Sequence, residues 1–178
     1  MDRRLRYRAL IIGLMGVAAV QFLGMQSPAA QRTASADPAL STVRSFYQFH
    51  FAHNKNFTPR NVQERKRWLT PELYNLLLQE LKREAEESKA HPDEAPYFEG
   101  DPFTDSQEYP DSFRVGKSDV NGDTSKVTVT LLWSARTSRG RDRRDIVVEV
   151  TKTAKAWLIS DVINNEGKRL RDELNRAR

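Results

Sequence analysis

The sequence predicts an α+β domain, because helical patterns fill its first half and strand patterns fill its second half. Apolar residues recur at spacings of three and four over residues 40–85, whereas residues 113–163 are rich in Val, Ile, Thr and Trp. Helices followed by an antiparallel run of strands favour a curved sheet that wraps a helical layer. We therefore expect N-terminal helices packed in the concavity of a bent antiparallel sheet, followed by a short C-terminal helix.

Residues 1–36 have the composition of a secretory signal peptide. Four arginines precede an apolar run from Ala9 to Met25, and Ala34-Ser35-Ala36 supplies the small residues that a signal peptidase accepts. We expect export by general secretion, cleavage before Asp37 and a periplasmic or cell-envelope protein. The alternative is that the 17-residue apolar run stays as a membrane anchor, since its length is near the lower limit for spanning a bilayer.

Removing that segment changes the charge balance of the chain. It holds five of the 29 Lys and Arg and one of the 24 Asp and Glu, so the remainder has 24 basic and 23 acidic residues and a net charge of +1. This balance and the expected export argue against a nucleic-acid partner. Residues 37–178 suffice for a single domain, which contains no cysteine and therefore neither a disulfide nor a lipid-bearing Cys.

Three helices are expected between residues 38 and 91. Thr58-Pro59 and Thr70-Pro71 each offer a hydroxyl N-cap followed by proline at the first helical position, so a short helix should run from residue 59 to about 68 and a longer one from 71 until Pro92. The opening helix carries one apolar stripe, formed by Leu40, Val43, Phe46, Tyr47, His50 and Phe51.

Residues 91–113 are the most biased segment, with seven acidic residues, four prolines and no Lys or Arg. The prolines forbid continuous regular structure, so we expect a long ordered loop with a short strand or turn at residues 97–103. Asp101 precedes Pro102, and we expect its carboxylate to accept backbone N–H bonds and fix a turn.

Four strands are expected over residues 113–120, 126–135, 144–153 and 156–163, with Asn121-Gly122 as the hairpin signal between the first two. In the second strand, Val127, Val129, Leu131 and Trp133 share the core face. In the fourth, Asp161 shares its phase with Trp157, Ile159 and Ile163, and Trp157 is expected to bury most of its ring. The terminal helix is expected within residues 168–178.

Three short motifs resemble the nuclear-transport-factor-2-like (cystatin-like cone) superfamily. Trp157-Leu158-Ile159-Ser160-Asp161-Val162-Ile163 is similar to its closing strand, and Val43-Arg44-Ser45-Phe46-Tyr47 is similar to its opening helix. Asp101-Pro102-Phe103 with Gln107 resembles an uncharacterised exported bacterial family within this group. The resemblance spans roughly residues 38–174 and implies a pocket in a cone between helices and sheet. It implies no single activity, because the superfamily holds dehydratases, isomerases, immunity proteins and binding modules.

His50, Tyr47 and Asp161 are the candidates for catalysis, because enzymes of that superfamily place His, Asp or Tyr inside the cone. The simpler interpretation is that His50 is a hydrogen-bonded core residue and that Asp161 caps a turn or pairs with an arginine. No nucleophile or phosphate motif is present. Asp119-Val120-Asn121-Gly122-Asp123 only superficially resembles a calcium loop, since glycine falls at its fourth position, so we expect a hairpin and neither a metal nor a cofactor.

Two charged regions are candidates for binding a partner. The acidic loop contributes Asp101, Asp105 and Gln107, and the basic 136–144 hairpin contributes Arg139 and Arg141. The alternative is that both are solvated surface. The absence of a catalytic set favours a non-enzymatic binding module for an unidentified protein or small ligand of the cell envelope, with a dehydratase- or isomerase-like enzyme as the alternative.

Overall fold

A computed structural model of the 178-residue chain describes residues 37–134 and 142–176. The chain divides into two units, residues 1–33 and residues 34–178, and the helices and strands reported below belong to the second. The expected export signal lies outside the described residues. Within the described ranges, no helix has the length and apolar character needed to cross a membrane.

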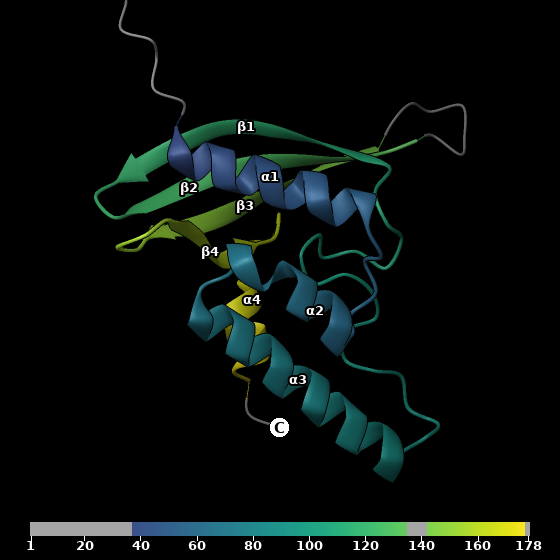
Figure 1. Ribbon diagram of the computed structural model, residues 1–178. Helices are drawn as coiled ribbons and strands as arrows, with labels where there is room; N and C mark the ends of the chain where they lie inside the picture. The colour runs from purple at the N-terminus through teal and green to yellow at the C-terminus, as the bar shows by residue number, and fades with distance from the viewer. Residues whose placement is uncertain (1–36, 135–141, 177–178) are drawn as a thin grey trace, which may run out of the picture. The chain divides into compact units, whose positions relative to one another are not determined.

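The element order is helices first and an antiparallel sheet second, as predicted. In chain order they are α1 (Pro38–Ala52), α2 (Pro59–Arg65), the 3-10 helix η1 (Lys66–Trp68), α3 (Pro71–Ala90), β1 (Ser112–Asn121), β2 (Thr124–Trp133), β3 (Asp142–Lys152), β4 (Trp157–Ile163) and α4 (Leu170–Leu174). Figure 1 labels all of them except η1.

Side-chain caps start the first three helices. Asp37 accepts hydrogen bonds from the backbone N–H groups of Ala39 and Leu40 at the start of α1. The hydroxyls of Thr58 and Thr70 accept the backbone N–H three residues later, each at 3.3 Å. Both Thr-Pro pairs therefore begin helices, as the sequence predicts.

The four strands form one antiparallel sheet in the order β1-β2-β3-β4. The β1–β2 hairpin closes at Gly122, whose φ of +60° lies in the left-handed region that glycine adopts without strain. The register of β4 against β3 shifts once, because Glu149 faces Asp161 while Val150 faces Ile159. Ser160 is the extra residue of this β-bulge.

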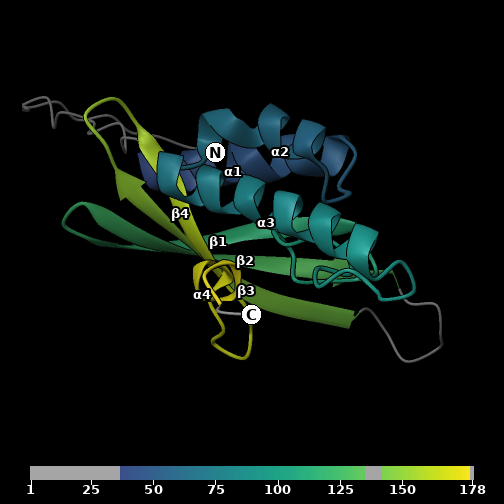
Figure 2. The same ribbon diagram turned by 90° about the horizontal axis from the view of Figure 1, so that it is seen from below.

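Helices α1, α2 and α3 lie on one face of the sheet in both views (Figures 1 and 2). Side chains from β2, β3 and β4 meet those of α1 and α3 in a single core, whose buried members include Val43, Phe46, Leu73, Leu77, Val127, Val129, Leu131, Ile146, Val148 and Ile159. Val127, Val129 and Leu131 confirm the predicted core face of β2. The α4 helix is joined to α3 by Arg83, which donates to the Leu174 carbonyl oxygen at 2.9 Å, and to β4 by Asp161. Arg176, just after α4, pairs with Glu80 of α3.

Trp157 packs against the core with most of its surface buried, as the sequence predicts. It is less completely enclosed than Ile159 and Asp161, which are fully buried, and Trp133 is partly buried in the same way. Trp157 is the first residue of β4 and pairs with Lys152 at the end of β3, and its carbonyl oxygen accepts the Thr42 hydroxyl of α1 at 3.1 Å. It therefore lies at the end of the sheet beside α1.

Candidate functional site

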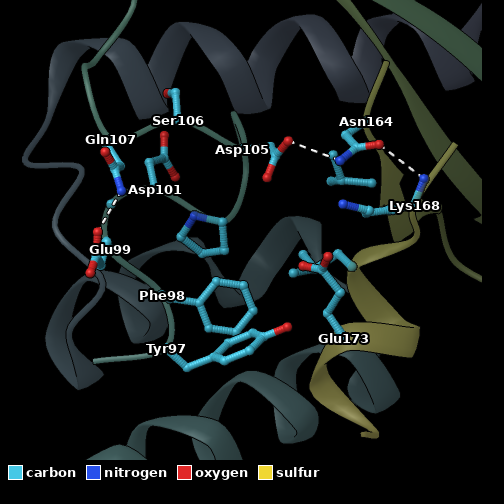
Figure 3. A pocket seen from close by; sticks show the side chains of 14 residues that line it. Tyr97, Phe98, Glu99, Asp101, Asp105, Ser106, Gln107, Asn164, Lys168 and Glu173 are labelled. Atoms are coloured by element: carbon cyan, nitrogen blue, oxygen red, sulfur yellow. Dashed lines mark hydrogen bonds between the residues drawn. The ribbon is translucent and has the colours of Figure 1, made fainter. Parts of the chain in front are cut away.

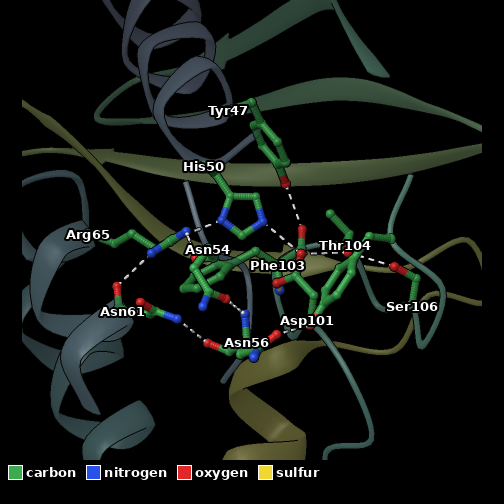
Figure 4. A network of polar contacts seen from close by, with 11 residues as sticks. Tyr47, His50, Asn54, Asn56, Asn61, Arg65, Asp101, Phe103, Thr104 and Ser106 are labelled. Atoms are coloured by element: carbon green, nitrogen blue, oxygen red, sulfur yellow. Dashed lines mark hydrogen bonds and ion pairs between the residues drawn. The ribbon is translucent and has the colours of Figure 1, made fainter. Parts of the chain in front are cut away.

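A buried polar network joins α1, α2 and the acidic loop (Figure 4). His50 on α1 lies between two charged groups: its Nε2 is 2.6 Å from Asp101 Oδ2, and its Nδ1 is 2.8 Å from Arg65 Nε. Each of the three side chains is at most 2% exposed. Arg65 also donates to the backbone carbonyls of Asn61 and Asn54, each at 2.8 Å. The guanidinium charge is therefore compensated inside the protein.

The arginine determines the tautomer of His50. A guanidinium can only donate hydrogen bonds, so Nδ1 must be the acceptor, and the proton is on Nε2, which donates to Asp101. Burial lowers the pKa of Arg65, and the nearby Asp101 and Glu64 charges oppose that change. Both imidazole nitrogens are occupied, so His50 has no nitrogen with which to accept a proton from a substrate.

Asp101 organises the acidic loop as well as the histidine. Its Oδ1 accepts the Phe103 N–H at 3.0 Å, and its Oδ2 accepts the Thr104 hydroxyl at 2.7 Å. The expectation that Asp101 fixes a turn is confirmed. At its start, Gly100 has a φ of +143°, and a Cβ there would lie 2.3 Å from the Ser106 carbonyl oxygen, so only glycine fits.

Tyr47 holds the same loop from the opposite side. Its hydroxyl donates to the Phe103 carbonyl oxygen at 2.8 Å. Burial raises the pKa of Tyr47 well above its usual value, and the Asp101 charge raises it further. The phenol therefore stays protonated near neutral pH and acts as a structural donor.

Asp161 caps the C-terminal helix. Its Oδ1 accepts the N–H of Val162 at 2.9 Å and of Arg171 at 3.1 Å, and its Oδ2 accepts Arg169 Nε at 2.9 Å. No residue at the start of α4 provides a side-chain cap, so the carboxylate of β4 takes that role. Burial raises the pKa of Asp161, and the hydrogen bonds and charge from Arg171 and Arg169 oppose the rise. The structure therefore confirms the simpler interpretation of Asp161, which is that it pairs with an arginine and caps a turn of the chain.

A pocket of about 280 Å³ lies between the acidic loop and the β4–α4 connection (Figure 3). Its lining is mostly polar, with two aromatic rings, and does not include Tyr47, His50 or Asp161. The lining residues are Tyr97, Phe98, Glu99, Gly100, Asp101, Pro102, Asp105, Ser106, Gln107, Val162, Asn164, Lys168, Leu170 and Glu173.

Hydrogen bonds across the chain hold this pocket together. Asp105, a non-glycine residue with a φ of +48°, accepts from the Asn164 side-chain amide at 3.0 Å. Gln107 donates to Glu99 within the loop. Arg144 of β3 donates to the Asp105 carbonyl oxygen. The acidic loop is thereby attached both to the sheet and to the segment before α4.

Of the predicted binding residues, Asp105 and Gln107 line this pocket with exposed side chains. Asp101 contributes to its wall, but its carboxylate oxygens are occupied by internal hydrogen bonds. Arg139 and Arg141 lie outside the described residues, as does most of the predicted basic hairpin. Sequence reasoning missed Lys168 and Glu173, which carry no local signal. The two adjacent aromatic residues Tyr97 and Phe98, in an otherwise polar and proline-rich loop, could have indicated a binding site from the sequence.

Metal-ligating side chains are not clustered in the described ranges: no three or more His, Asp or Glu residues there could jointly hold a metal ion. The chain contains no cysteine. Nothing in the pocket thus provides a ligand set for a transition metal.

No protein-family model and no curated protein matches the chain. Two solved structures are similar to it. The type VI effector–immunity complex Tae3–Tai3 from Ralstonia pickettii has a TM-score of 0.44 at 16% identity over 70% of this chain and 93% of that chain. A protein of unknown function from Bacteroides thetaiotaomicron has a TM-score of 0.39 at 19% identity over 70% and 87%. At TM-scores below 0.5 these similarities do not establish a common fold.

Proposed function

We propose that this protein is an exported, non-enzymatic binding module that engages a protein partner through the pocket between the acidic loop and α4. The observation that carries the proposal is the contrast between two sets of polar groups. Those of the core network are buried and bonded to one another. Glu99, Asp105, Gln107 and Lys168 also make internal contacts, but their side chains are exposed along the wall of the pocket and can reach a partner.

The same contrast argues against the dehydratase- or isomerase-like alternative. An acid–base enzyme needs a titratable group that reaches the substrate. The nitrogens of His50 face Arg65 and Asp101, the Tyr47 hydroxyl donates to a carbonyl, and the Asp161 oxygens cap α4. None of these three lines the pocket.

We also propose that the domain is nuclear-transport-factor-2-like and that residues 1–36 direct its export. The support for the first is the sequence resemblance together with helices that cover one face of a bulged antiparallel sheet. The support for the second is the charged, apolar and small-residue order of the first 36 residues.

Site-specific photocrosslinking tests the binding proposal. A benzophenone amino acid at Gln107 reports on the pocket, and the same amino acid at Val120, which is 52% exposed on the β1–β2 hairpin and is not a lining residue, is the matched control. After irradiation of cells that express each variant, we expect a discrete crosslinked protein at Gln107 and none at Val120. The same bands from both positions, or no band from Gln107, would refute the proposal.

A further inference from the structure

We infer that the pocket receives the guanidinium group of an arginine side chain from the protein partner, between the Glu173 carboxylate and the rings of Tyr97 and Phe98. This inference rests on the proposed function and adds to it the chemical group that the pocket recognises.

The charge of the pocket favours a cation. Three carboxylates of the lining, on Glu99, Asp105 and Glu173, have partly or fully exposed side chains, and Lys168 is the sole Lys or Arg in that lining. Lys168 Nζ lies 2.8 Å from a Glu166 carboxylate oxygen, and Arg144 Nη1 lies 4.0 Å from Asp105 Oδ2. Glu99 and Glu173 are therefore the accessible carboxylates of the lining that have no ion pair with the described residues. A pocket with this surplus attracts a positively charged group and repels an anion.

Glu173 is the carboxylate with the least compensation. Its side chain makes no hydrogen bond or ion pair with the residues that the structure describes. Burial raises its pKa, and the Asp105 charge raises it further, while Lys168 and Arg176 oppose the rise. Burial makes the ionised form of Glu173 less favourable. A cation placed beside Glu173 would stabilise that form, because the carboxylate would gain an opposite charge.

The aromatic wall adds a preference for a planar cation. Figure 3 shows Tyr97 and Phe98 side by side with Glu173 near them, and the two rings meet edge to face with centroids 5.2 Å apart. Tyr97 is 48% exposed. A guanidinium can stack on such a ring and bind a carboxylate with two parallel N–H bonds, which an ammonium group cannot do.

The chain itself contains an example of this chemistry. The guanidinium of Arg176 lies 3.1 Å from the centroid of the Tyr97 ring and donates to Glu80 at 2.6 Å. The same guanidinium lies 5.6 Å from the centroid of the Phe98 ring and donates to the Glu173 carbonyl oxygen. Two aromatic rings and a carboxylate thus already bind one arginine next to the pocket, outside its lining. An incoming arginine would find the same two kinds of partner in the pocket: the carboxylate of Glu173 and the exposed part of the Tyr97 and Phe98 rings.

The volume of the pocket is large enough to accept one side chain of a partner protein. At about 280 Å³ it falls just under the range of roughly 300–1,000 Å³ that is typical of small-molecule sites. An arginine side chain delivered by a partner protein fits within this volume, with further contacts made around the rim.

NMR titration with n-butylguanidinium tests the inference on the purified protein. The neutral n-butylurea, which has nearly the same shape, is the control probe. We expect n-butylguanidinium to shift the backbone amide signals of Phe98 and Leu170 in a saturable manner, and n-butylurea to leave them unchanged. Equal shifts with both probes, or saturable shifts confined to other parts of the domain, would overturn the inference.

Two variants sharpen the test. Glu173→Gln should weaken n-butylguanidinium binding roughly fivefold, whereas Asp172→Asn, an exposed neighbour on the same helix, should leave it unchanged. The amide spectrum of each variant shows whether it is folded. A folded Glu173→Gln protein that binds the cation with unaltered affinity would also overturn the inference.

The two proposals fail separately. A specific crosslink at Gln107, combined with no preference for the cation, would keep the binding module and refute the arginine pocket. Cation binding that depends on Glu173, with no crosslinked protein at Gln107, would support the arginine-sized cation site and refute the protein-binding module.

Discussion

At the scale of single residues, His50 is a structural residue because two side chains from different parts of the chain bond both nitrogens of its imidazole. Arg65 comes from α2 and Asp101 from the acidic loop, and each bonds one imidazole nitrogen. The network replaces an apolar core contact with charge-assisted hydrogen bonds that require a defined geometry. It attaches the loop that forms the pocket to the helical layer.

Asp101→Asn should lower the free energy of unfolding by roughly 3 kcal/mol. The amide group of Asn cannot accept from both His50 and Thr104 while it also accepts the Phe103 N–H. This cost exceeds the roughly 1 kcal/mol of an ordinary turn hydrogen bond, because Asp101 is the buried partner of His50. Chemical denaturation measures the change. Asp93→Asn, in the exposed part of the same loop, should show no change, and equal stability of both variants would contradict the prediction.

Trp157→Ala should cost less than its size suggests. The ring is only partly buried, whereas Ile159 two residues later is 0% exposed. We expect a loss of about 1–2 kcal/mol for Trp157→Ala and of about 3 kcal/mol or more for Ile159→Ala. Thermal unfolding of the two variants gives the comparison, and a reversed order would show that Trp157 anchors the core after all.

Glu173 introduces a dependence of stability on pH. Its folded-state pKa is raised, so the folded protein binds that proton more tightly than the unfolded chain does. The free energy of unfolding therefore falls as pH rises from the ordinary Glu pKa through the raised folded value.

In Glu173→Gln this contribution is absent. At neutral pH the variant should be more stable than the parent by roughly a few tenths of a kcal/mol, given solvent screening, and the difference should vanish at low pH. Urea unfolding at several pH values, with Asp172→Asn as the control, measures it. A variant less stable than the parent at neutral pH would mean that Glu173 has a stabilising partner.

At the scale of elements, α4 is a short helix that depends on contacts from other parts of the fold. It spans Leu170–Leu174, too short to be stable alone. Asp161 caps its start, while Arg83 donates to the Leu174 carbonyl oxygen at 2.9 Å near its end. The fully buried Glu80 pairs with both Arg83 and Arg176. Because α4 carries Glu173, these contacts position one wall of the pocket.

Glu80→Gln should loosen α4 selectively. Loss of the charge leaves Arg83 and Arg176 undercompensated, so we expect a loss of about 3 kcal/mol. Amide hydrogen exchange should accelerate most over residues 170–174, while β2 and β3 stay protected at a level set by global unfolding. Glu72→Gln, on an exposed turn of α3, is the control. Uniform acceleration over the whole domain would show that α4 does not open as a separate unit.

At the scale of the whole molecule, the proposed export predicts the mature terminus. Cleavage after Ala36 would leave Asp37, the N-cap of α1, as the first residue. We expect N-terminal sequencing of the protein isolated from its own cells to begin at Asp37 and fractionation to place it in the cell envelope. An intact Met1 on cytoplasmic protein would contradict export, and an intact Met1 on membrane-bound protein would indicate that the segment stays as an anchor.

The features that the sequence by itself determined are those set by neighbouring residues. Thr58 and Thr70 begin helices because their hydroxyls bond N–H groups three residues ahead. The alternation of β2 places Val127 and Val129 in the core because a strand has a period of two. Gly122 closes a hairpin because the turn needs a positive φ.

Only the tertiary structure decided the site, because its contacts join residues that are far apart in sequence. His50 and Asp101 are 51 residues apart, and Glu80 and Arg176 are 96 apart, so no local pattern predicts either pair. Because Ser160 is bulged, Val162 pairs with the buried Val148 on the core face. Asp161 pairs with Glu149 on the opposite face and bonds Arg169, whereas strict alternation from Ile159 predicts that Asp161 points into the core. The pocket likewise exists only where the acidic loop meets α4. Packing therefore determined which charged side chains are internal supports and which, like Glu173, remain available to a partner.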